Sequence, residues 1–502
     1  MEGTLIINSF QQLPKPNLVV MKSLLHLLLV LLLAQYCEAQ NVGIGTTAPL
    51  EKLQVAGNIK ADTLKPNAFK FIANAGAGKV LTSDATGNAN WQNSNSSATS
   101  NIGFGVWGDC AANGNISEYN PVADPEGGAG DRFGVSVAIS GNYAIVGAHL
   151  DDVGSNTNQG SASIYQYING AWIFMQKLTD GNGAPNDLYG YSVSIFGNFA
   201  AVGAYWDDVT SNADQGSVNI YQFDGNSWIL LEKLIDNTGG AGDLFGISVA
   251  FADNYLMVGS PGDDVGAIAD QGSVSIYKYD GRYWVLMQKL TDPAGASNDN
   301  FGFSVSISGN YAISGSYADA GVAGAAQGSA TIFTYNGISW VFMQKLTDAN
   351  GAVNDWFGYR VSISGNYAIV GIPLRNVGTN LDQGAADIYQ YDGNNWVFMQ
   401  KLSDGGGSSN DWFGQSVFIS GNYVIVGAYE DDIGANTNQG SASIYLKMGQ
   451  GWQKLQYITD PGGNSGDSFG FSTTFDQTTK RFIIGAYGYG AISGKVVFGK
   501  VN

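Results

Sequence analysis

Cysteine and histidine are nearly absent from this chain, with two of each among 502 residues. Cys37 and His26 lie in an N-terminal stretch that we interpret below as a removable leader, which leaves Cys110 and His149. The mature chain then has no cysteine pair for an intrachain disulfide and no His/Cys set for a metal cluster. A nucleophile–base pair would depend on His149, which occurs in a single repeat, so we expect no enzymatic activity.

Charged residues are also scarce, at 13% of the chain, and 23 Lys and Arg against 42 Asp and Glu give a net charge of −19. This charge argues against a nucleic acid as partner, because phosphate backbones are bound by clustered cations. It favours cations or basic surfaces instead. The 70 glycines and the 12% of aromatic residues are typical of short strands and tight turns, not of long helices.

The apolar run 24–34 is too short for a transmembrane helix, since it has about half of the roughly 20 residues that such a helix needs. It follows Met21-Lys22-Ser23 and precedes Cys37-Glu38-Ala39, which is similar to a small-residue cleavage site. The pattern predicts a secretory signal within residues 1–40, with Met21 as the true start. We therefore expect a secreted or cell-surface protein, without a lipid anchor and without a membrane span after cleavage.

Residues 41–91 contain short alternating strands divided by glycine, and residues 92–115 form a Ser/Asn-rich linker. The phrases at 42–49 (VGIGTTAP) and 79–87 (KVLTSDATG) resemble N-terminal segments of bacterial surface and tail-fibre-like proteins. This resemblance implies an extended β-rich stalk that is able to oligomerise.

The rest of the chain repeats a pattern every 56 residues. An aromatic residue followed by glycine recurs at Phe133, Tyr189, Phe245, Phe301, Phe357, Phe413 and Phe469. A tryptophan keeps the same interval at Trp172, Trp228, Trp284, Trp340, Trp396 and Trp452. A period of this length indicates a repeat architecture in which each unit buries its apolar faces against its neighbours, and we expect the tryptophans in that core.

Each repeat contains four strand signals. In the first, 135–140 and 143–148 flank a Gly-Asn turn, and 161–167 and 172–178 flank an Asn-Gly turn. Four antiparallel strands are typical of a propeller blade. The seventh copy ends after three strands, whereas 116–122 matches the fourth strand 340–346 in register. We therefore predict an all-β fold over 116–502, a seven-bladed β-propeller closed by an N-terminal strand and preceded by the short β-rich stalk.

The Phe-Gly-x-Ser-Val pattern at Phe133, the Val-Gly-Ala that ends at Ala148, and the Gly160–Tyr165 strand start resemble the FG-GAP repeat of integrin α-subunit propellers. The bacterial secreted FG-GAP proteins are more similar still. Integrin-type repeats often carry an Asp-x-Asp-x-Asp-Gly calcium loop between the first two strands. Here Ser140-Gly141-Asn142 stands at that place, so this calcium site is not carried over.

Acidic residues fall in two places that open on one face of such a blade. The connector between repeats holds two aspartates seven residues apart, from Asp124 and Asp131 to Asp460 and Asp467, and we expect them to accept hydrogen bonds from turn backbone. The loop between the second and third strands holds the pairs Asp151-Asp152, Asp207-Asp208, Asp263-Asp264 and Asp431-Asp432. The fourth repeat keeps only Asp319, and the fifth has Arg375-Asn376.

Two interpretations of the loop pairs stay open. They form a solvated acidic rim, or they bind Ca²⁺ together with Asn156, Asn212 and Asn436 through oxygen ligands. Calcium is the one cofactor that the sequence suggests. A glutamine column, Gln159, Gln215, Gln271, Gln327, Gln383 and Gln439, is expected to anchor these loops.

The sequence thus predicts a binding or adhesion module that uses the acidic loop face for a protein or glycan ligand on an extracellular surface. An adhesin would use the irregular loops of the fourth and fifth repeats, at Ala318, Leu374 and Arg375. A lectin-like propeller would instead have several similar weak sites around the ring. If the lectin depends on calcium, these sites would include the loop pairs. Irregular aromatics are candidates for stacking on a ligand: Tyr205, Trp206, Tyr317 and Tyr429.

Overall fold

The computed structural model describes residues 116–321, 326–488 and 494–502, together with four short strands nearer the N-terminus. The chain divides into two compact units, 1–102 and 103–502. In the first, β1 (Val42–Ile44) pairs in parallel with β2 (Leu53–Val55), and β3 (Lys79–Ser83) pairs antiparallel with β4 (Ala89–Asn93). The expected signal, 1–40, and almost all of the expected linker, 92–115, lie outside the described residues.

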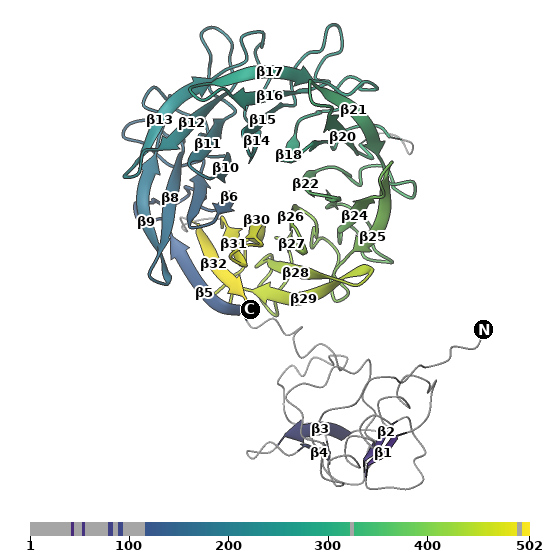
Figure 1. The fold of residues 1–502 in the computed structure, drawn as a ribbon. Helices are drawn as coiled ribbons and strands as arrows, with labels where there is room; N and C mark the ends of the chain where they lie inside the picture. The colour runs from purple at the N-terminus through teal and green to yellow at the C-terminus, as the bar shows by residue number, and fades with distance from the viewer. Residues whose placement is uncertain are drawn as a thin grey trace, which may run out of the picture. The chain divides into compact units, whose positions relative to one another are not determined.

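The second unit consists of seven four-stranded antiparallel sheets, the blades, arranged around a central axis (Figure 1). From the axis outward, the strands are β6 (Ser136–Ser140), β7 (Tyr143–Ala148), β8 (Ser161–Ile168) and β9 (Ala171–Leu178) in blade one; β10 (Ser192–Phe196), β11 (Phe199–Ala204), β12 (Ser217–Phe223) and β13 (Trp228–Leu234) in blade two; β14 (Ser248–Ala252), β15 (Tyr255–Ser260), β16 (Ser273–Tyr279) and β17 (Trp284–Leu290) in blade three; β18 (Ser304–Ser308), β19 (Tyr311–Ser316), β20 (Ser329–Tyr335) and β21 (Trp340–Leu346) in blade four; β22 (Arg360–Ser364), β23 (Tyr367–Ile372), β24 (Ala385–Tyr391) and β25 (Trp396–Leu402) in blade five; β26 (Ser416–Ser420), β27 (Tyr423–Ala428), β28 (Ser441–Met448) and β29 (Gly451–Thr459) in blade six; and β30 (Phe469–Asp476), β31 (Arg481–Ala486), β32 (Lys495–Val501) and β5 (Ile116–Ala123) in blade seven.

Blade seven combines the two ends of the repeat region. β5 is its outermost strand and pairs antiparallel with β32, with Tyr119 opposite Gly499 and Pro121 opposite Val497. Figure 1 shows the two strands side by side. The pairing agrees with the register of the repeats, and it completes the fourth strand of the last sheet without a further segment. No helix long and apolar enough to cross a membrane occurs in the described part of the chain.

The core lies between the blades, where the tryptophans pack against rings of the neighbouring sheet. Trp228 is 1% exposed and contacts Tyr143 of blade one, with ring centroids 5.5 Å apart and planes at 82°. Trp340 meets Tyr255 in the same way, at 5.7 Å and 89°. This confirms that the tryptophan column belongs to the core.

The aromatic–glycine step is buried at the start of each blade, and the glycine is required there. Gly190 has φ +92°, and a Cβ atom on it would lie 2.1 Å from the carbonyl oxygen of Ser161. A side chain at this place would therefore collide with the backbone of the preceding blade.

Serine side chains complete the hydrogen bonds of the innermost strands. Ser304, Ser306 and Ser308 of β18 accept bonds, at 3.1 Å each, from the backbone N–H groups of 361 and 363 in β22 and of 365 directly after it. An innermost strand has a free edge toward the axis, where unpaired N–H groups would be costly without such acceptors. The alternating serines of these strands are thus explained by their neighbours in the next blade.

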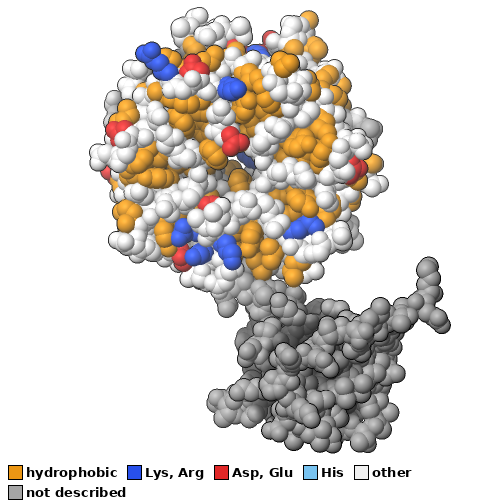
Figure 2. All heavy atoms as spheres, viewed as in Figure 1, with side chains coloured by type: hydrophobic (Ala, Val, Ile, Leu, Met, Phe, Trp, Pro, Cys, Tyr) orange, Lys and Arg blue, Asp and Glu red, His pale blue; other side chains and the backbone are white. Residues whose placement is uncertain are grey.

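Two cavities lie on the axis between the innermost strands. A cavity of about 560 Å³ lies toward the turns between first and second strands, with Ser140, Phe196 and Asp476 among its lining residues. A second cavity, of about 170 Å³, lies toward the blade connectors. Figure 2 shows a hollow at the centre of the face in view, on which red and blue side chains are few.

Candidate functional site

The loop between the second and third strands of one blade meets the connector to the next blade at one end of the propeller, which we call the loop face. Gln159 in the loop donates from Nε2 to the carbonyl oxygen of Asp180 in the connector, at 2.7 Å. The bond recurs at distances of 2.5 to 2.8 Å from Gln215, Gln271, Gln327, Gln383 and Gln439. The expected role of this column as a loop anchor is confirmed.

The connector aspartates hold the turn in which they lie. Asp180 accepts from the backbone N–H of Asn182 at 3.0 Å, and Asp187 accepts from that of Ala184 at 2.6 Å. The other connectors repeat both bonds, and the side chains are buried in nearly every blade. The predicted bonding of these carboxylates to turn backbone is confirmed.

A column of lysines in the outermost strands approaches these carboxylates: Lys177, Lys233, Lys289, Lys345 and Lys401. The Nζ atom of Lys289 lies 2.8 Å from Asp236 of the connector and 2.5 Å from Asp263 of the loop. We did not single out this column from the sequence, although the Gln-Lys-Leu or Glu-Lys-Leu ends of the tryptophan strands recur at the 56-residue interval.

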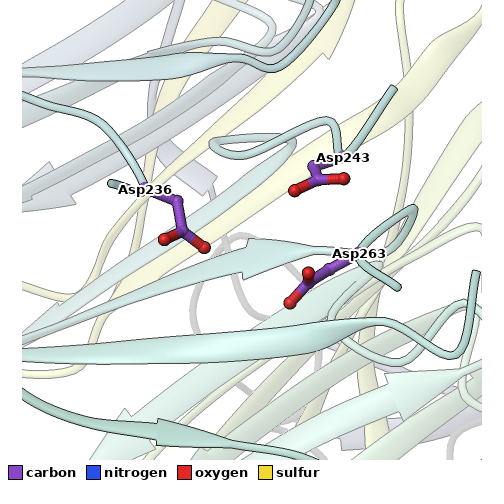
Figure 3. A group of neighbouring side chains, drawn as sticks. All are labelled: Asp236, Asp243 and Asp263. Carbon is purple, nitrogen blue, oxygen red and sulfur yellow. The ribbon is translucent and has the colours of Figure 1, made fainter. Parts of the chain in front are cut away.

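Three buried aspartates in blade three form a set that could hold a metal ion. Ligand oxygens of Asp236, Asp243 and Asp263 all lie within 4.8 Å of one another, and Figure 3 shows the three carboxylates around a common space. The ammonium of Lys289 contacts two of them, so a cation of the chain already compensates the cluster. Burial raises the pKa of Asp243 to about 6. Burial also acts on Asp236, but Lys289 and two hydrogen bonds from Thr238 together outweigh it and hold the pKa below its usual range.

The two aspartates of each loop pair have different partners. The first, at Asp151, Asp207, Asp263 and Asp431, is buried. The second aspartate is exposed, and this holds for Asp152, Asp208, Asp264 and Asp432. Each of these carboxylates accepts a hydrogen bond from the backbone N–H six residues later, at 2.8 to 2.9 Å. The nearby amides, Asn156, Asn212 and Asn436, donate to the anchoring glutamines of the same loops. Calcium binding by these loops stays one of the two interpretations that the sequence offers.

Blades five and six depart from this arrangement. In blade five, the Nη1 atom of Arg375 lies 2.5 Å from Asp355, and Leu374 beside it is half-buried. The charge of Arg375 is thus directed onto the protein's own connector. In blade six, Tyr457 stands where blades one to five have lysine, and its hydroxyl donates to Asp431 at 2.6 Å. Burial and the charges of Asp431 and Asp404 raise the pKa of Asp411 to about 7.

The irregular aromatics of the sequence lie on the loop face in contact with other rings. Tyr205 packs on Tyr191 at 4.6 Å and on Trp206 at 5.5 Å, and Trp206 is 42% exposed. Tyr317 packs on Phe303 at 4.6 Å. Stacking on a ligand requires an exposed ring, and Tyr429 does not meet this condition, because it is 7% exposed and packs against Trp412 and Phe471.

These rings belong to a larger set, which we call the axial collar: Tyr191, Tyr205, Trp206, Phe303, Tyr317, Trp356, Tyr359, Trp412, Tyr429, Phe471 and Tyr487. From Phe303 to Tyr487 an unbroken series of ring contacts runs over blades four to seven, with Trp356 as the ring that contacts Trp412. Arg132 of blade one lies 5.3 Å above Tyr487. Tyr191, Phe303 and Phe471 line the 170 Å³ cavity on the axis.

Sequence reasoning missed most of the collar, although a signal exists. Its members stand at positions where the repeats differ from one another. The residue after the aromatic–glycine step, for example, is Val135, Tyr191, Ile247, Phe303, Tyr359, Gln415 or Phe471.

A family model for the FG-GAP repeat matches residues 121–165, 172–221, 228–277, 284–333, 340–389 and 396–445. This chain belongs to the FG-GAP repeat family. From 172 onward, each matched segment of this FG-GAP propeller begins at the tryptophan of one blade and ends in the third strand of the next. The FG-GAP propeller fold indicates a ligand-binding module. No curated protein matches the chain.

Proposed function

We propose that this FG-GAP propeller is a secreted or cell-surface binding module that acts in adhesion, and that it contacts its ligand through the loop face. The observation that supports this most is the axial collar. Rings from five blades gather at one end of the axis, and the sequence places them at positions that the repeat does not require.

The contrast with the core aromatics supports a role in binding. The tryptophans that seal the blades recur at the same place in six repeats, because every blade junction needs the same packing. A collar ring that served only the fold would be expected to recur in the same way. Aromatic residues are also enriched at the centres of binding interfaces, where they combine apolar area with little conformational freedom.

We propose binding without catalysis. His149 is 5% exposed, and its ring packs against Tyr191 at 5.5 Å. Burial lowers the pKa of His149 to about 3. A general base works best with a pKa near the operating pH and within reach of the substrate, and His149 meets neither condition.

A glycan is the second candidate ligand, and the shape of the collar favours it. Trp356 and Tyr359 are stacked with an angle of 13° between their planes, and Trp206 of the same collar is exposed. Flat rings of this kind offer apolar faces to the C–H groups of a sugar.

The test uses the full secreted chain on a glycan array and on immobilised extracellular matrix proteins, each read with and without Ca²⁺. Trp206→Ala removes an exposed collar ring, and we expect it to weaken binding on the surface that responds. Tyr283→Ala is the matched control, because this ring is 44% exposed in a turn between third and fourth strands, at the opposite end of the blade. The proposal would be contradicted if both variants lost binding equally, or if neither variant lost binding.

Secretion is tested separately. N-terminal sequencing of the chain from the medium or surface fraction of an expressing cell should give a start near Gln40 or Asn41. Retention of the chain inside the cell with residues 21–40 intact would contradict it.

A further inference from the structure

An arginine breaks a serine ring at the loop-face end of the axis. The second residue after the aromatic–glycine step, which lies on the innermost strand, is serine in six blades and Arg360 in blade five. The six serines are Ser136, Ser192, Ser248, Ser304, Ser416 and Ser472. All seven positions line the cavity of about 170 Å³.

The serines have a structural role that Arg360 cannot perform. The hydroxyl of Ser136 donates to the carbonyl oxygen of Gly190 in the next blade, at 2.7 Å. Four other serines of the ring make the same bond at 2.6 to 2.8 Å. Blade five lacks this hydroxyl, so it departs from a bond that the fold repeats. Departures of this kind are expected where a position serves function more than stability.

Two rings and one backbone carbonyl hold the guanidinium in place. It lies 5.1 Å from the centroid of Phe303 and 4.8 Å from that of Tyr359, and Nη1 donates to the carbonyl oxygen of Tyr359 at 3.1 Å. The hydroxyl of Tyr191 in blade two lies beside it; burial raises the pKa of Tyr191, and the positive charge of Arg360 opposes that rise. A guanidinium has five N–H donors, and these contacts use only a part of them.

Arg360 also lacks the anionic partner that most cations of the loop face have. Lys177, Lys233, Lys289, Lys345, Lys401 and Arg375 all form ion pairs with aspartates. Arg360 forms none with the described residues, in a chain with 42 acidic residues. A fixed guanidinium in a concave site is complementary to a planar carboxylate, which it can bind with two parallel hydrogen bonds.

The surroundings restrict the ligand further. A cavity of about 170 Å³ has room for five or six waters at about 30 Å³ each, which is the scale of one terminal group of a ligand. The collar rings provide apolar faces beside the guanidinium. The net charge of −19 disfavours a polyanion, because long-range repulsion would oppose its approach.

We infer that this cavity binds a carboxylated sugar at the end of an otherwise neutral glycan, with the carboxylate on Arg360 and the pyranose ring against the collar. The inference rests on the proposed function, of which it names the ligand class.

The experiment measures binding of sodium glucuronate, glucose and sodium acetate to the full chain by calorimetry and saturation-transfer NMR at low salt. Glucuronate supplies the carboxylate and the ring, and the other two probes supply one each. We expect glucuronate to bind about tenfold more tightly than either. Arg360→Ser introduces the residue of the other six blades and should fold normally, as a thermal melt verifies. In this variant the preference for glucuronate over glucose should fall to about one.

Arg282→Ser is the matched control, because this arginine is exposed in a turn at the opposite end of blade three, and it should keep the preference. A preference that survives in Arg360→Ser would overturn the carboxylate site. If acetate binds as tightly as glucuronate, the pyranose ring contributes nothing to binding, and the assignment of a sugar as the ligand would be wrong. If a natural surface is bound in a Trp206-dependent manner but glucuronate is not bound, the proposed function stands and this inference fails.

Discussion

Asp387 and Lys401 lie opposite each other on β24 and β25, with 2.9 Å between Oδ1 and Nζ. The other blades have an uncharged residue at the place of Asp387, such as Ser275 or Thr331. Blade five needs this carboxylate because Arg375 stands where its neighbours have the loop aspartate that pairs with the lysine. Two charge changes in one cluster thus compensate each other.

Asp387→Ser should therefore destabilise the propeller on its own. It leaves Lys401 and Arg375 with Asp348 as a shared partner, and breaking a largely buried ion pair costs about 2–4 kcal/mol. The double variant Asp387→Ser/Arg375→Asp restores the arrangement of the other blades and should recover most of the loss. Chemical unfolding of the single and double variants gives the coupling energy. Additive losses would show that the two positions are independent.

Buried carboxyls predict an unusual dependence of stability on pH. The pKa is raised to about 6 in Asp187, Asp243 and Asp387 and to about 7 in Asp411, chiefly by burial. An unfolded aspartate has a pKa of about 3.9. The folded state therefore binds these protons more tightly, so the contribution is complete below about pH 4 and is lost as the pH rises through 6 to 7.

Other carboxyls act in the opposite sense. Lysine or arginine partners, together with hydrogen bonds from backbone N–H groups, hold the pKa of Asp236, Asp319, Asp348 and Asp460 below its usual value, despite burial. Their contribution is lost as the pH falls below about 4. The melting temperature should thus rise from pH 8 to about pH 5 and fall again below pH 4. Asp411→Asn should reduce the change in melting temperature between pH 6 and 8, whereas the exposed control Asp208→Asn should leave that change as it is. A melting temperature that climbs steadily from pH 5 to 8 would refute this.

The features that sequence reasoning found are those that recur. The blades, the tryptophan core, the connector aspartates and the glutamine anchors repeat at one interval, so each was visible several times over. The lysine clusters were missed for a spatial reason. Lys289 and Asp263 are 26 residues apart and meet only because β17 lies two strands outside the loop that follows β15. The pairing depends on how the sheet is ordered, which the spacing alone does not state.

The axial collar was missed for the opposite reason. Its rings stand where the repeats disagree, and a search for periodicity discards such positions. Their proximity also follows from closure, because residues hundreds of positions apart converge on the axis only when seven sheets surround it. Arg360 and Tyr191, for instance, come from blades five and two.

Trp340→Ala tests the core directly. The side chain is 2% exposed and packs between Tyr255 and Tyr335, so truncation should cost about 3–5 kcal/mol through lost burial and an unfilled cavity. Trp206→Ala, at an exposed ring, should cost less than about 1 kcal/mol. Urea unfolding of both variants is the measurement. Similar losses would contradict the assignment of one ring to the core and the other to the surface.

The role of lysine in the carboxylate clusters can be separated from that of calcium by removing one ammonium. In the natural chain, Lys289 contacts Asp236 and Asp263, so we expect EDTA and millimolar Ca²⁺ to leave the melting temperature of the propeller unchanged within about one degree. Lys289→Met removes the cation and leaves three buried carboxylates within 4.8 Å, which should lower the melting temperature by several degrees.

Oxygen ligands at this spacing suit a hard divalent cation. Calcium should therefore restore part of the stability of Lys289→Met by binding its folded state, and EDTA should abolish the effect. Lys454→Met is the matched control, because its ammonium contacts Asp404 at an exposed site of blade six. It should neither lose comparable stability nor respond to calcium. A calcium response in the natural chain equal to that of Lys289→Met would mean that the ammonium does not occupy the place of a metal.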